Sequence, residues 1–389
     1  MTVDIPISEM SFPTRMVVGP GALARLPHEM EKLGTKRALI VADKGIKSAG
    51  LVEKVEKVIA EGGLAGAVYL GVSKNPIERD VLEGVETLRR VEADVVIGLG
   101  GGAPMDVAKT IALKATHELP LIEYDDLIGG DRKIHGNMPP VIAIPTTAGT
   151  GSEVGRASVI CLGDDGHKVV IFSPHMLPNV AICDAELTVG LPPHITAATG
   201  MDALTHALEA YVSNGNHPFA DMFALGALTR VGRYLVRAVR DGEDIKARHE
   251  MLVASSMAAI SFQKGLGACH ALAHPLSAVA DLHHGLANAI MLPHVIEYNL
   301  DAASEAYAIA GQALGDNVSG TLALRARSCF NMVWSILEAI GSPRRLAPLG
   351  VKKKMIPTMV EQAVIDAAAA GNPKKLTPEA AKDLYERAM

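Results

Sequence analysis

The sequence predicts an α/β domain with a parallel sheet, followed by an all-helical domain. In the first half of the 389-residue chain, short β-branched runs alternate with amphipathic helical stretches, a pattern typical of right-handed βαβ units. From about Leu187 onward, helical segments rich in Ala, Leu and Met follow one another with few strand-like runs. We therefore expect an α/β domain over residues 1–187 and a helical domain over residues 188–389, a length that supports two hydrophobic cores.

The elements of the first half can be placed one by one. Buried strands are expected where apolar and β-branched residues run together, and helices where apolar residues recur every three to four positions. The expected strands are 37–43, 65–70, 94–102 and 141–147, and the expected helices are 50–63, 78–93 and 104–115. Residues 157–172 differ, because Gly163–Gly166 gives a turn signal between two β-branched runs. We expect a hairpin there.

Composition excludes several classes of function. The net charge is −6 and the basic residues are scattered, so no basic surface for nucleic acid is expected. No run approaches the length of a membrane span, and the first residues lack the apolar core of a signal peptide. The four cysteines are far apart and form no C-x-x-C pair. These features predict a reduced, cytoplasmic protein whose partner is a small molecule.

A glycine turn follows the third expected strand. "GLGGGAPMD" (98–106) matches G-x-G-x-x-A and opens a helix, so its backbone N–H groups could approach a pyrophosphate. A tight turn without any ligand would share this pattern, which alone is weak evidence. A second small, hydroxyl-rich turn, "PTTAGTGSE" (145–153), follows the next strand. Both turns lie at carboxyl ends of parallel strands, where Rossmann-like sheets bind ligands.

Asp43 ends the first expected strand. A carboxylate at this position can accept hydrogen bonds from ribose hydroxyls and would repel a 2′-phosphate, which favours NAD over NADP. The same residue could equally cap a helix or lie in a surface turn. The sequence leaves both interpretations open.

Four histidines lie in "GACHALAHPLSAVADLHHGLANA" (267–289), which otherwise consists mostly of apolar residues: His270, His274, His283 and His284. Burial of an imidazole costs free energy unless both ring nitrogens find partners. His270 and His274 have helical i, i+4 spacing, and Pro275 is expected to end or kink their helix. Any one of these histidines alone is more commonly a hydrogen-bonded core residue than a metal ligand.

A carboxylate comes from another segment. "ATGMDALTHALEAY" (198–211) predicts a helix that starts near Gly200 and carries Asp202 and His206 on one face. One carboxylate and three imidazoles make a suitable site for a divalent first-row metal, with positions left open for water or substrate. The donor set accepts iron or zinc.

Together these motifs resemble the iron-containing, group III alcohol dehydrogenases. The motifs are "GGGAPMD", "PTTAGTGSE", "ATGMDALTHALEAY", "CHALAHPL", "HHGLANAIMLPHV" and the C-terminal "GNPKKLTPEAAKDLY". The resemblance implies a dehydroquinate-synthase-like architecture and an NAD(P)-dependent hydride transfer between a small alcohol and its aldehyde or ketone. It also implies at least a homodimer, because family members commonly pair the β-rich segment "MSFPTRMVVG" (10–19), which has no obvious partner here, across a dimer.

The resemblance assigns roles to individual residues. The family's metal ligands fall on Asp202, His206, His270 and His284, and its histidine beside substrate and nicotinamide falls on His274. Its cofactor contacts fall on Asp43, Asn75, Gly101, Gly102, Ala103, Asp106, Thr146, Thr147, Thr150 and Lys168.

Three positions depart from the family pattern. Ala103 replaces a serine, which removes a hydroxyl that could help bind phosphate, and Gly155 stands where many members carry threonine. His283 stands where proline is common, so either member of the pair His283 and His284 could bind the metal.

Other functions remain open at this point. Glycerol-dehydrogenase-like and maleylacetate-reductase-like enzymes share the expected fold. A dehydroquinate-synthase-like lyase would need a basic cluster, and no dense group of Lys and Arg lies around the proposed ligands in the sequence. A metal-binding or structural subunit without turnover is the alternative from another class. The sequence names neither the alcohol nor the choice between iron and zinc.

Overall fold

The computed structural model describes residues 14–163 and 167–389. Contacts divide the chain into two compact units. The first contains the described residues up to Thr147 together with Gly151–Gly190, and the second contains Ala148–Thr150 and Leu191–Met389. None of the helices in the described part of the chain is long and apolar enough to cross a membrane.

The first unit is built around a six-stranded parallel sheet. Its strand order is β1-β8-β5-β4-β2-β3, and every pairing is parallel. The strands are β1 (Arg15–Val18), β2 (Arg37–Val41), β3 (Ala65–Tyr69), β4 (Val95–Gly100), β5 (Val141–Pro145) and β8 (Val180–Cys183). The helices are α1 (Leu26–Lys32), α2 (Lys44–Ser48), α3 (Leu51–Glu61), α4 (Glu78–Arg90) and α5 (Gly102–Lys114). The predicted parallel α/β domain is confirmed.

Helices cover both faces of this sheet. In β2, Leu39 and Val41 belong to a core shared with α4 and α5. Ala38 and Ile40, which point to the opposite face, belong to a second core shared with α1 and α3. Because both faces are buried, the strand is a continuous apolar run rather than an alternating one.

The N-terminal segment, for which the sequence shows no obvious partner, has one in the sheet. β1 pairs in parallel with β8, from Arg15 opposite Val180 to Val18 opposite Cys183. Asp184, directly after β8, accepts hydrogen bonds from the backbone N–H groups of Gly21 (3.0 Å) and Leu23 (2.9 Å). This carboxylate fixes the chain that leaves β1. Residues 10–13 of the segment lie outside the described part of the chain.

The predicted hairpin is also present. β6 (Ala157–Leu162) pairs antiparallel with β7 (His167–Phe172). Residues 164–166 of the expected turn lie outside the described residues.

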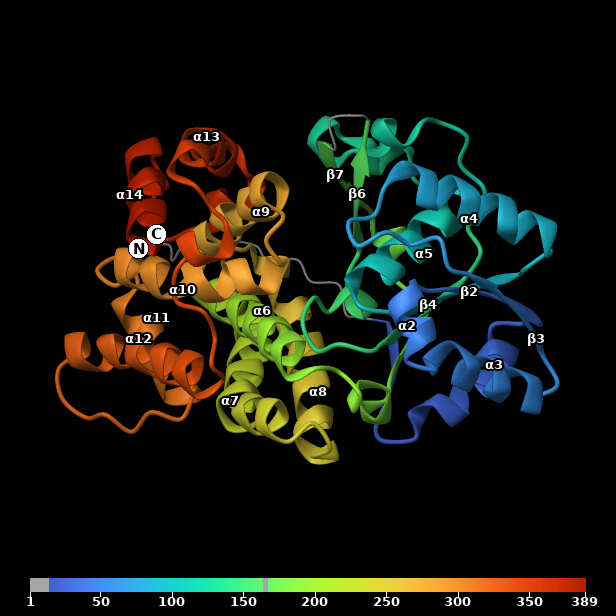
Figure 1. Cartoon of the computed structure of the whole chain (residues 1–389), viewed down its shortest axis with the longest axis horizontal. Coiled ribbons are helices and arrows are strands. Elements are labelled where there is room, and N and C mark those ends of the chain that lie inside the picture. Colours follow the sequence, from blue (N-terminus) through green and yellow to red (C-terminus); the bar gives the residue numbers. More distant parts are fainter. Residues whose placement is uncertain (1–13, 164–166) are drawn as a thin grey trace, which may run out of the picture. The chain divides into compact units, whose positions relative to one another are not determined.

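The second unit is helical. Its helices are α6 (Pro193–Val212), α7 (Pro218–Arg240), α8 (Ile245–Ser261), α9 (Ala268–Ala280), α10 (His284–Asn299), α11 (Ser304–Ala313), α12 (Leu322–Ala339), α13 (Ile356–Ile365) and α14 (Pro378–Ala388). Within this unit α6 packs against α7, α8 and α10, and α10 packs against α9 (Figure 1). One continuous hydrophobic core joins these helices.

Two details refine the sequence-based expectations. α6 begins at Pro193, so Gly200 lies inside the helix. A Cβ atom there would lie 2.2 Å from Cδ1 of Leu235, and the glycine therefore serves close packing rather than the helix start. At Pro275, where the sequence predicts either an end or a kink, α9 does not end but continues to Ala280. The neighbours Leu272 and Leu276 are fully buried, and this packing compensates for the hydrogen bond that proline cannot donate.

Candidate metal and cofactor sites

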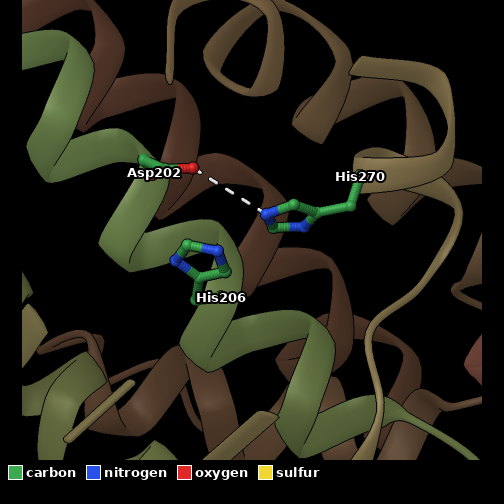
Figure 2. A group of neighbouring side chains, drawn as sticks. All are labelled: Asp202, His206 and His270. Carbon is green, nitrogen blue, oxygen red and sulfur yellow. Dashed lines mark ion pairs between the residues drawn. The ribbon is translucent and has the colours of Figure 1, made fainter. Parts of the chain in front are cut away.

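One face of α6 carries three buried polar side chains. Asp202, His206 and Glu209 follow each other at helical spacing and are all nearly inaccessible to solvent. His270, near the start of α9, faces Asp202 and His206 from another helix (Figure 2). The donor atoms of Asp202, His206 and His270 all lie within 4.8 Å of one another. The structure thus brings together three of the four predicted ligands in the core of the helical unit.

The fourth predicted ligand, His284, is the first residue of α10. Its Nε2 atom lies 3.4 Å from Oδ1 of Asp202. The next residue, Gly285, allows this approach, because a Cβ atom there would lie 2.1 Å from the carbonyl oxygen of Ala198 on α6. His283 is the N-cap residue of α10.

Asn288 marks the point on which these donors converge. Its Nδ2 atom donates a hydrogen bond to Oδ1 of Asp202 (2.8 Å) and lies 3.3 Å from Nε2 of His270 and 3.2 Å from Nε2 of His284. A carboxylate oxygen and two imidazole nitrogens therefore surround one electropositive group. Such a donor set suits a divalent metal ion, so the residues present fit the metal that the sequence predicts.

The electrostatics of the cluster agree with this interpretation. Burial opposes the charge of Asp202, but the surrounding histidines outweigh it and hold the pKa of Asp202 well below its usual range. Burial lowers the pKa of His206 to about 4 and the pKa of His284 well below its ordinary value. For His270, burial is outweighed by the nearby carboxylates of Asp202 and Glu209, which raise its pKa to about 9. At neutral pH His206 and His284 therefore keep free lone pairs, whereas His270 must give up a proton when it binds a metal.

His274 lies on α9 at the edge of this cluster. Its side chain is 41% exposed, and its ring stacks on that of His284 with centroids 5.3 Å apart. Its Nδ1 atom lies 2.7 Å from Oδ2 of Asp366, the residue that follows α13. The other oxygen of Asp366 accepts the backbone N–H of Ala368 (2.9 Å). Burial opposes ionisation of Asp366, but the hydrogen bond from His274 outweighs it and lowers the pKa of Asp366. The carboxylate therefore holds the imidazole with Nδ1 as the donor.

Most of the predicted cofactor contacts lie at the carboxyl ends of the strands of the sheet. Asp43 follows β2, Gly101 follows β4 and Thr146 follows β5, and these three strands are neighbours. Gly100 has φ +146°, and a Cβ atom on it would lie 2.7 Å from Cγ of Pro104, so only glycine suits this turn. The two turns touch: a Cβ atom on Gly101 would lie 3.4 Å from Oγ1 of Thr147. The N-terminus of α5 opens at these strand ends, as anion binding requires.

The structure places the remaining cofactor candidates individually. Asp43 caps α2, because its Oδ1 atom accepts the backbone N–H of Ile46 (2.9 Å). Asn75 is exposed in the segment that follows β3, and Lys168 lies half-buried in β7 opposite Cys161. Gly102 and Ala103 form the first turn of α5, and Thr150 lies in the short stretch grouped with the helical unit.

Asp106 has partners within the α/β unit. Its Oδ1 atom accepts the hydroxyl of Ser152 (2.6 Å) and lies 3.2 Å from Nζ of the buried Lys109. Its Oδ2 atom accepts the backbone N–H of Val159 (3.1 Å) in β6. Asp106 therefore ties α5 to the hairpin, and its contact with a cofactor stays a prediction.

Comparison with known proteins identifies the family. Residues 13–185 match the iron-containing alcohol dehydrogenases, and residues 196–389 match the C-terminal part of the Fe-containing alcohol dehydrogenase family. The chain belongs to this family. It is 38% identical over 375 residues to 1,3-propanediol dehydrogenase of Klebsiella pneumoniae, covering 95% of this chain and 96% of the relative. It is 36% identical over 380 residues to NAD-dependent methanol dehydrogenase of Bacillus methanolicus, covering 97% and 99%.

A solved structure supports the same assignment. That of 1,3-propanediol oxidoreductase superimposes with a TM-score of 0.95 at 37% identity, covering 99% of this chain and 100% of the other. The family resemblance and the fold class predicted from the sequence are confirmed. The protein is a metal-dependent alcohol dehydrogenase, an oxidoreductase that acts on CH–OH groups.

Three polar residues of this iron-containing alcohol dehydrogenase were missed by the sequence analysis: Glu209, Asn288 and Asp366. Glu209 and Asn288 could have been found, because each lies one helical turn from a predicted ligand on the same helix. Asp366 gives no such signal, since it is far from His274 in the sequence.

Proposed function

We propose that the enzyme interconverts a small alcohol and its aldehyde or ketone with NAD and a divalent metal. The first candidate for this metal is Fe²⁺. The proposed metal ligands are Asp202, His206, His270 and His284. One observation carries the proposal: Asp202, His270 and His284 direct donor atoms toward a single point, the Nδ2 atom of Asn288.

The residues around this point have different roles in the reaction. A divalent metal supplies Lewis acidity to the substrate oxygen, and a nicotinamide supplies the hydride acceptor. His274 lies beside the ligands and stays partly exposed, so it can meet substrate. Because Asp366 holds its Nδ1–H, the Nε2 atom of His274 can accept the hydroxyl proton of an alcohol or return it to a carbonyl compound. The glycine turn at the start of α5 would bind the pyrophosphate, and Asp43 the ribose.

One experiment tests the function as a whole. The purified enzyme is analysed for bound metal, and NADH formation is followed with a panel of small alcohols under aerobic and anaerobic conditions. We expect close to one divalent metal per chain and NADH formation with at least one alcohol. Activity restricted to glycerol or to maleylacetate would favour the corresponding relatives of the same fold. Bound metal without turnover on any substrate would favour a non-catalytic metal-binding protein.

Asp43 sets the preference for NAD. Replacing it by glycine should improve NADP use relative to NAD by about fivefold, because a like charge beside the 2′-phosphate costs about 1 kcal/mol even in water. The measurement is the ratio of kcat/KM for the two cofactors. Since Asp43 also caps α2, Asp43→Ser is the matched control: it keeps the cap and removes the charge. Both variants should shift the ratio alike, and an unchanged ratio in both contradicts the assignment.

The enzyme should assemble through the edge of its sheet. β1 is the terminal strand of the sheet, and exposed strand edges are usually covered. We expect a homodimer or a higher homo-oligomer, with a mass by light scattering of at least twice 40.9 kDa. A 40.9 kDa species at micromolar concentration would exclude this assembly.

The free cysteines of the described chain support a reducing, cytoplasmic location.

A further inference from the structure

Glu209 has an unusual set of hydrogen bonds for a buried side chain in the last turn of a helix. Its Oε1 atom accepts the backbone N–H of Cys269 (2.6 Å). Its Oε2 atom accepts the backbone N–H of His270 (3.2 Å) and lies 2.6 Å from Nδ1 of the same histidine. One carboxylate on α6 therefore holds both the backbone and the ring of a residue on α9.

The first of these effects concerns the start of α9. The first N–H groups of a helix lack partners within the helix, and the N-cap residue Gly267 has no side chain to supply one. Glu209 provides the missing acceptor from another helix, and its negative charge suits the positive end of the helix dipole. Gly267 makes room for it, because a Cβ atom there would lie 2.7 Å from Oε1 of Glu209.

The second effect concerns the ring of His270. A carboxylate that accepts from Nδ1 fixes the hydrogen on that atom, which leaves the lone pair of the neutral ring on Nε2. Nε2 is the atom that lies 3.8 Å from Oδ1 of Asp202 and 3.3 Å from Nδ2 of Asn288. Glu209 thus turns the correct nitrogen of His270 toward the point where the donors meet.

We propose that Glu209 is a positioning residue for the metal. It is not itself a ligand; it selects the tautomer and orientation of His270 and ties α9 to α6, so that donors from two helices are assembled before the metal binds. The proposal rests on the metal site of the proposed function. Loss of a partner of this kind weakens metal binding about 10- to 100-fold.

The test measures metal affinity and not turnover. Full-length wild type and Glu209→Gln are freed of metal with a chelator and titrated with Zn²⁺ in competition with a fluorescent zinc indicator. Glutamine keeps the shape but replaces one acceptor oxygen by a donor NH₂ group, so it cannot accept from all three N–H groups. We expect the affinity of Glu209→Gln for Zn²⁺ to fall by about 10- to 100-fold.

Asp184→Asn provides a matched control. Asp184 is also a buried carboxylate that accepts several backbone N–H groups, but it lies in the α/β unit and contacts Gly21, Leu23 and Glu186. Its replacement should lower the melting temperature and leave the affinity for Zn²⁺ unchanged. A purely structural role for Glu209 would give the same result in Glu209→Gln, and that result would overturn the proposal.

A second variant covers the case in which Glu209→Gln fails to fold. Gly267→Ala keeps the carboxylate but pushes against Oε1, so it should weaken Zn²⁺ binding by a smaller factor. If Gly267→Ala is then the only folded variant, wild-type affinity in it overturns the proposal. Failure of the wild type itself to bind Zn²⁺ would instead refute the metal site and the proposed function.

Discussion

Replacing His270 by alanine should remove the bound metal and, with it, alcohol oxidation. His270 supplies a donor atom from the core of the helical unit, where its ring is almost fully buried. The replacement removes one of the three donor groups, Asp202, His206 and His270, whose atoms lie within 4.8 Å of one another. The lost Lewis acidity is worth several kcal/mol, so activity should fall by at least about a thousandfold. Elemental analysis and NADH formation measure the two effects.

His284 and His283 provide a matched pair for the same experiment. The structure places Nε2 of His284 close to Asp202, so His284→Ala should lose metal and activity as His270→Ala does. His283→Ala should keep the metal and most of the activity. Loss of metal from the His283 variant but not from the His284 variant would show that the neighbouring histidine is the ligand.

Replacing His274 by alanine should have the second largest effect, and a different one. The metal should remain, because His274 lies outside the group of donor atoms near Asp202. kcat should fall by about 10²–10⁴-fold, the usual contribution of a general acid–base. Metal content and kcat, measured on the same preparation, check the prediction. Loss of metal from His274→Ala would make this histidine a ligand and leave the proton route without a residue.

Asp366→Asn tests whether that carboxylate acts through His274. It should lower kcat less than His274→Ala, because the imidazole stays in place and loses only the charged acceptor at Nδ1. In the His274→Ala background the same change should have little further effect, since residues that act as a unit are not additive. Equal losses in both backgrounds would contradict this coupling.

The central part of the fold could be predicted because its signals are local. β2, β4 and β5 are apolar runs bounded by turn residues, and α3 and α4 show clear helical spacing. The partner of β1 could not be found this way. It depends on β8, a strand of only four residues, and on a carboxylate that reaches back to the start of the chain. Of the two effects expected of Pro275, an end or a kink, the end is excluded, because α9 continues to Ala280.

In the candidate site, too, local signals could be predicted and contacts between distant segments could not. Asp202 with His206, and His270 with His274, share helix faces, so spacing alone grouped them into pairs. The chemistry of one carboxylate and three imidazoles suggested that the two pairs belong to one metal site, and the choice of His284 as the remaining ligand came from the family resemblance. The contacts that orient them join distant segments: Glu209 and His270 are 61 positions apart, and Asp366 and His274 are 92 apart. A local sequence pattern cannot reveal contacts between residues so far apart in the chain.

The pairing of β1 with β8 has a consequence for the order in which the chain folds. During synthesis the N-terminal strand emerges first, but its hydrogen-bonding partner begins only at Val180. β2, β3 and β4 can pair with one another long before that, so β1 remains an unpaired, apolar edge while most of the unit is already built. Pairings of such large sequence separation form slowly and leave strands exposed to aggregation. Closure of the sheet by β8 and Asp184 is thus expected to be a late event in folding.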